Sequence, residues 1–115
     1  RVPSLTNNDI KAVETLKSKY DLSNQSKKIA ALTNLNATDE EKSRYLRMML
    51  PDSSLDSGYV QRGIETLGEE NLYTIYLYKK IATNYDGGVG AFITDNFDTK
   101  EEQDTWRYIL TNPKK

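Results

Sequence analysis

Three carboxylates beside a cluster of tyrosines are the side chains best suited to chemistry in this chain: Glu69, Glu70 and Asp86. Hydrolysis of a glycosidic bond needs only two carboxylates, one protonated as the acid and one ionised as the base or nucleophile. The neighbouring aromatic rings would stack against a sugar. A carboxylate-dependent carbohydrate-processing enzyme is therefore one functional alternative.

Two further patterns resemble ligand-binding loops but fail in their spacing. Residues 86–90 (Asp-Gly-Gly-Val-Gly) lack the Lys-Ser/Thr pair of a phosphate-binding P-loop. Residues 52–58 and 95–98 carry the acids of a calcium loop. In the first of these loops, however, the glycine stands one place late, and Gly63 replaces the bidentate glutamate. We expect turns and helix caps at all of these positions.

The most decisive feature of the composition is that the 115 residues include no histidine and no cysteine. The chain therefore cannot build a Ser-His-Asp triad, a thiolate nucleophile, a disulfide or the commonest zinc sites. No apolar run approaches the roughly 18 residues of a membrane-spanning helix. We expect no catalytic residue, no metal, no cofactor and no membrane insertion.

Four side chains in the aromatic segment are the candidate binding residues: Tyr73, Tyr76, Leu77 and Tyr85. Tyrosine is enriched at protein interfaces because it combines a large rigid surface with a polar tip. On a helix, Tyr85 would continue the buried stripe, whereas the other three would point elsewhere. A helix that is apolar all round either lies in the centre of the core or contacts a partner. Both alternatives remain open from the sequence.

Charge is balanced over the whole chain, at a net −1, but it is uneven along the chain. Residues 1–50 hold nine lysines and arginines against six acids, and residues 51–115 hold seven against eleven. Five lysines of the first two expected helices could form a basic face: Lys11, Lys17, Lys19, Lys27 and Lys28. Weak nucleic-acid binding through this face is a second alternative, disfavoured by the acidic second half.

Apolar spacing and caps predict two helices in the first third of the chain. Apolar residues at intervals of three and four predict a helix over 9–21, with Ile10 and Tyr20 on its buried stripe. A cap at Ser23 or Asn24 predicts a second, shorter helix.

The clearest local signal predicts a third helix over 38–50. Thr38 and Glu41 have the spacing of a capping box, and a proline ends the helix. A fourth helix is expected from residue 56 or 57, closed by Gly68.

The segment 69–85 is ambiguous between a helix and a strand, and we favour the helix. The strand alternative places a β-hairpin around 72–94, with an Asp-Gly turn. Beyond it, Asp98 faces Glu101 in a second capping signal, which predicts a last helix with Trp106 turned inward.

Together these signals predict an all-α fold, a single small bundle of five or six short helices over 1–115. Residues 1–8 are expected to form an extended lead-in and 112–115 a tail, and the alternative is an α+β fold with the hairpin. The predicted function is a non-catalytic protein–protein interaction module that binds another protein through an aromatic surface around Tyr73–Tyr85. Because the chain begins at Arg1 rather than Met, we interpret it as part of a larger or processed protein.

Overall fold

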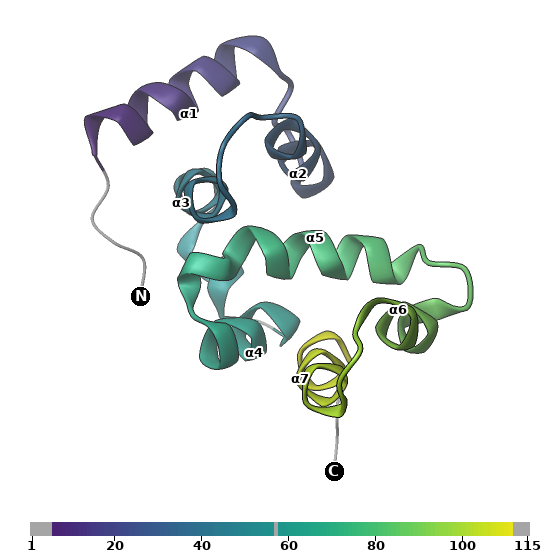
Figure 1. Cartoon of the computed structure of the whole chain (residues 1–115). Coiled ribbons are helices and arrows are strands. Elements are labelled where there is room, and N and C mark those ends of the chain that lie inside the picture. The colour runs from purple at the N-terminus through teal and green to yellow at the C-terminus, as the bar shows by residue number, and fades with distance from the viewer. Residues whose placement is uncertain (1–5, 57, 112–115) are drawn as a thin grey trace.

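The computed structural model describes residues 6–56 and 58–111, and seven α-helices with no strand make up this part of the chain (Figure 1). This confirms the all-α class. The hairpin alternative is wrong, since residues 72–83 are helical. The predicted tail over 112–115 and most of the lead-in lie outside the described residues. The helices are α1 (Asn7–Lys19), α2 (Gln25–Thr33), α3 (Asp39–Met49), α4 (Gly58–Leu67), α5 (Leu72–Thr83), α6 (Gly88–Asn96) and α7 (Lys100–Leu110), with short 3₁₀ turns η1 (Asp52–Leu55) and η2 (Glu69–Asn71).

Helix α5 crosses the middle of the fold, with α1, α2 and α3 on one side and α4, α6 and α7 on the other (Figure 1). Two clusters of buried apolar side chains form the core, and α5 contributes to both. Leu72, Tyr73 and Tyr76 belong to the first cluster. Ile75 and Ala82 belong to the second. The described residues therefore form one all-α domain in which α5 joins the two clusters.

Several helix boundaries follow the local signals in the sequence. The Thr38 hydroxyl accepts the Glu41 N–H at 3.0 Å, and the Glu41 carboxylate accepts the Thr38 N–H at 2.9 Å, which confirms the capping box of α3. Asn24 is the N-cap of α2. Gly68 follows α4 with a φ of 94°, a left-handed conformation that glycine adopts without a steric cost. The local capping residues and the glycine were therefore enough to predict these helix ends.

The starts of α1 and α7 are each displaced from their predicted positions. Thr6 and Asp9 form a capping box, so α1 begins two residues earlier than expected. The N-cap of α7 is Thr99 rather than Asp98, because the Thr99 hydroxyl accepts the Glu102 N–H at 3.1 Å. In α1 the single acid of the first turn, Asp9, is the third residue of the helix. In α7 two acids are adjacent, Glu101 and Glu102, and the cap at Thr99 makes Glu102 the third residue.

The buried stripe of α1 is shorter than predicted, because the residues at its two ends are exposed. Val13 and Leu16 are buried, but Ile10 and Tyr20 are 45% and 41% exposed. The main packing partner of α1 is α3, and the two ends of its apolar stripe extend beyond this contact. Tyr20 is the C-cap residue and already has an extended backbone, which turns its side chain away from the helix face.

Helix α6 was not predicted, and it brings the number of α-helices in the described residues to seven instead of five or six. Its glycines suggested a turn, and Gly87 does adopt a left-handed conformation with a φ of 99° just before the helix. Phe92 and Ile93 then bury themselves in the second cluster. Tertiary burial thus outweighs the low helix propensity of the glycines in this segment.

Helices α4 and α5 approach each other closely at Gly63. A Cβ atom added to Gly63 would lie 2.6 Å from Cδ1 of Ile75, a side chain that is fully buried. Only glycine therefore fits at this position without displacing Ile75 or separating the two helices.

We predict that Gly63→Ala destabilises the protein by about 1–2 kcal/mol, because the cost of overpacking exceeds the gain in helix propensity. The control is Gly90→Ala in α6, where an added Cβ has no heavy atom within 4 Å. That substitution should stabilise the protein by about 0.5–1 kcal/mol. Urea unfolding of both variants measures the difference, and equal effects would show that the α4–α5 contact does not require glycine.

Candidate functional site

The first predicted binding residue, Tyr73, is part of the core and is only 3% exposed. Its hydroxyl lies 2.8 Å from the Thr33 hydroxyl, and its backbone N–H donates to Ser43 Oγ at 2.9 Å. The ammonium of Lys42 lies 5.1 Å from the centre of its ring. These contacts hold Tyr73 of α5 against α2 and α3.

The other predicted binding residues occupy three different environments. Tyr76 is 4% exposed, and its ring meets that of Tyr59 edge to face at 5.7 Å. Leu77 is half-buried against the first core cluster. Tyr85 lies beyond α5 and donates a hydrogen bond to Asp95 at 2.9 Å. None of the four predicted residues is fully exposed, so they form no exposed aromatic patch by themselves.

A groove next to Tyr76 gives the aromatic segment its access to the surface. It runs between α2, α4 and α5 and encloses about 260 Å³. We call it the tyrosine groove, and its lining residues are Gln25, Ser26, Ile29, Tyr59, Tyr76, Lys79, Lys80, Thr83 and Asn84. Tyr59 and the two lysines were not singled out from the sequence, because only the fold brings α4 beside α5.

The two phenols of the tyrosine groove are neutral at physiological pH. Burial raises the pKa of Tyr59 to about 12, and burial also raises the pKa of Tyr76. The Lys79 ammonium lies 5.3 Å from the centre of the Tyr59 ring and donates to the Leu110 carbonyl at 3.1 Å. The groove therefore combines neutral aromatic rings with two ammonium groups that are hydrogen-bonded to backbone carbonyls.

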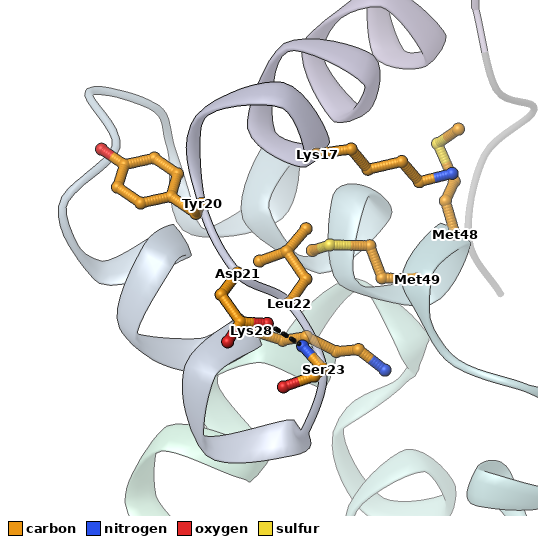
Figure 2. A pocket seen from close by; sticks show the side chains of 8 residues that line it. All are labelled: Lys17, Tyr20, Asp21, Leu22, Ser23, Lys28, Met48 and Met49. Carbon is orange, nitrogen blue, oxygen red and sulfur yellow. Dashed lines mark hydrogen bonds between the residues drawn. The ribbon is translucent and has the colours of Figure 1, made fainter.

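A second groove lies between the end of α1, the start of α2 and the end of α3 (Figure 2). It encloses about 400 Å³. We call it the lysine–methionine groove, and its lining residues are Lys17, Tyr20, Asp21, Leu22, Ser23, Lys28, Met48 and Met49. Met48 and Met49 are both half-buried at the end of α3. No pattern in the sequence singled out this groove, because adjacent apolar residues are both buried elsewhere in the fold, as at Phe92 and Ile93.

The one carboxylate of the lysine–methionine groove has hydrogen-bonding partners, whereas its two lysines do not have them in the described residues. The Asp21 carboxylate accepts hydrogen bonds from Lys27 Nζ at 2.6 Å and from the Ser23 N–H at 3.0 Å. These bonds hold the pKa of Asp21 below its ordinary value. Lys17 and Lys28 have no ion pair and no side-chain hydrogen bond within the described part of the chain.

A buried ion pair fixes the first turn of α1 against α3, at the end of α1 opposite the lysine–methionine groove. Arg44 Nε donates to Asp9 at 3.2 Å, and Asp9 is only 3% exposed. Burial by itself raises the pKa of Asp9, but the hydrogen bonds from Thr6 and Arg44 outweigh it and leave the pKa below its ordinary value. The ionised carboxylate therefore stabilises the docking of α1.

The predicted basic face is divided among different roles. Lys27 is paired with Asp21, and Lys17 and Lys28 line the lysine–methionine groove. Helix α2 buries Ile29 and Leu32 against the rest of the fold. Of the residue types expected to read a base edge, Arg, Asn and Gln, α2 carries only Gln25, and Gln25 lines the tyrosine groove. The nucleic-acid alternative therefore gains no support from this arrangement.

The carboxylates proposed for glycoside hydrolysis lie at opposite ends of α5. Glu69 and Glu70 precede the helix and Asp86 follows it. Twelve residues separate the two ends, which corresponds to about 18 Å at roughly 1.5 Å per residue. A pair of catalytic carboxylates lies within about 10 Å of each other, so Asp86 is too far along the axis of α5 to pair with Glu69 or Glu70.

Neither metal ligands nor a membrane span can be assigned within residues 6–56 and 58–111. No three acidic side chains gather there closely enough to hold a metal ion. In the same residues, none of the helices has both the length and the apolar character needed to cross a bilayer.

Comparison with known proteins gives no relative from which a function could be transferred. No family model, no curated protein and no solved structure matches the chain. The two grooves therefore have to be interpreted from their own geometry.

The Asp9–Arg44 pair predicts a pH dependence of stability. A lowered carboxyl pKa contributes stability that is complete above the ordinary value of 3.8 and is lost as the pH falls through the folded-state value. The free energy of unfolding of the wild type should therefore exceed that of Asp9→Asn by a constant amount from pH 7 to about pH 4. Below that, the difference should shrink. Urea unfolding across this range measures the effect, and a difference that grows on acidification would contradict it.

The raised pKa of Tyr59 predicts late ionisation during alkaline titration. Because the folded-state pKa is above the ordinary value of 10.0, the associated stability is intact below pH 10 and is lost as the pH rises towards 12. Tyr59→Phe should therefore remove absorbance of the phenolate near pH 12 and leave the step near pH 10 unchanged. The control, Tyr108→Phe, replaces a 43% exposed tyrosine and should leave the Tyr59 absorbance change near pH 12 in place.

Proposed function

We propose that this chain is a non-catalytic protein-interaction module that binds its partner through the tyrosine groove. The observation that carries the proposal is the edge-to-face pair of Tyr59 and Tyr76 at 5.7 Å, which lines an open groove between three helices. Protein interfaces concentrate their binding energy in aromatic side chains at the centre of a polar rim.

The rim of the tyrosine groove has the composition that such an interface needs. Gln25, Ser26, Thr83 and Asn84 are exposed polar residues around the aromatic pair. The Lys80 ammonium reaches the Ser26 carbonyl at 3.5 Å across the groove. The rim therefore offers donors and acceptors to a partner backbone, with positive charge from Lys79 and Lys80.

The size of the groove favours a side chain of a partner over a free small molecule. Sites for small molecules enclose about 300–1,000 Å³ and bury most of the ligand. The tyrosine groove, at about 260 Å³, lies just below this range. One protruding apolar or aromatic side chain would fill it, with the partner backbone resting on the rim.

Helix α5 is still the binding helix, but the residues that touch the partner differ from those predicted from the sequence. Tyr73 contributes by holding α5 in place, since both its hydroxyl and its N–H have partners inside the fold. Tyr59, Tyr76 and the exposed Thr83 are the residues that a partner would contact. Substitution of the buried tyrosines could unfold the protein and so reduce binding indirectly. The test therefore substitutes an exposed residue of the rim.

The test is a pull-down from native host extract with Thr83→Arg, whose long side chain would occupy the groove. We expect a specific protein to be recovered by the wild type and reduced by roughly tenfold or more with the variant, as for the loss of an interface hot spot. The matched control is Thr94→Arg, which places the same charge at an exposed threonine of α6. If Thr83→Arg keeps its thermal midpoint and recovers the same proteins as the wild type, the tyrosine groove is not the binding site.

A further inference from the structure

We infer that the lysine–methionine groove is a second binding site, specific for an acidic segment of a partner protein in which one apolar side chain is flanked by carboxylates. Three features of the groove support this inference: its apolar floor, its two ammonium groups without an ion pair in the described residues, and its separation from the tyrosine groove. The inference does not depend on the function proposed for the tyrosine groove, because the two grooves share no lining residue.

The floor of the groove is apolar and adaptable. Leu22, Met48 and Met49 are half-buried and pack against the first core cluster from its edge. Methionine is unbranched and polarizable, and surfaces rich in methionine adapt to apolar side chains of different shapes. The volume of about 400 Å³ leaves room for one large apolar side chain.

The walls of the groove carry positive charge that the fold does not neutralise. The side chains of Lys17 and Lys28 pass on either side of Leu22 and Met49 (Figure 2). The single acid of the groove, Asp21, is already bonded to Lys27 and to the Ser23 N–H. An incoming carboxylate would therefore find two available ammonium groups and no available competitor inside the groove.

This arrangement specifies the partner by charge complementarity. An apolar side chain on the floor would have an acidic neighbour within reach of each lysine. A neutral apolar segment would leave the two ammonium groups without partners, and an acidic segment with no apolar residue would leave the floor in contact with water. An anionic membrane is a poorer match, because the basic groups flank a concavity instead of forming a flat basic surface and because the chain has a net charge of −1.

The two methionines give a direct readout, since the chain contains only two and both line this groove. We propose to label their methyl groups with ¹³C in the full chain and to follow their NMR signals during titration. The probe is a short capped peptide with a central leucine flanked by glutamates. Two matched peptides replace either the glutamates by glutamines or the leucine by glycine, and phosphatidylserine vesicles are a fourth probe.

We expect both methyl signals to shift saturably with the glutamate–leucine peptide and to stay in place with the two matched peptides. The double variant Lys17→Gln/Lys28→Gln should raise the dissociation constant by roughly tenfold, as expected for the loss of two partly exposed charge pairs. The control Lys11→Gln/Lys19→Gln removes the same charge from exposed positions of α1 outside the groove and should leave the dissociation constant unchanged.

Several results would overturn the inference. Equal shifts with the glutamine peptide would show that charge plays no part, and equal losses in the two double variants would show that only net charge matters. Shifts with vesicles alone would assign the groove to a lipid surface. The absence of a shift with every probe would show that the groove binds no such segment.

Discussion

The hydrogen bond from the Tyr73 N–H to Ser43 Oγ is the contact on which the centre of the fold depends. Helix α5 begins inside the protein: its N-cap Asn71 offers no side-chain cap, and Leu72, Tyr73 and Ile75 of its first turn are buried. A buried N–H without a partner costs about 1–3 kcal/mol. Ser43 of α3 is fully buried and supplies the missing acceptor from another helix. Helices α3 and α5 are thereby held in one register, and the two core clusters are joined through them.

A similar arrangement closes the other end of the molecule. Arg62 of α4 donates to the Tyr108 and Ile109 carbonyls, and Lys79 of α5 donates to the Leu110 carbonyl. Cations are favourable there, because the C-terminus of a helix carries partial negative charge. Lys79 also lies over the Tyr59 ring, so the residue that anchors α7 also shapes a wall of the tyrosine groove.

The sequence was most informative where a boundary depends on residues close together in the chain, as at Thr38 and Gly68. It was least informative for α5, since a helix apolar on every side has no stripe to distinguish core from interface. The burial of Tyr73 is decided by Thr33 and Ser43, which are 40 and 30 residues away. Both grooves arise where separate helices meet, so only the fold could bring Lys17 and Lys28 to one groove or Tyr59 beside Tyr76.

The contrast between the two kinds of helix cap has a consequence for the order of folding. Helices α1, α3 and α7 each begin with a threonine capping box whose two partners are three residues apart. Such starts need no loop closure and can nucleate within the local chain. Helix α5 receives its cap from a serine 30 residues earlier, so its start becomes favourable only once α3 is present. The central helix is then expected to be consolidated after the helices that surround it, with its first turn appearing in the same step as the tertiary core.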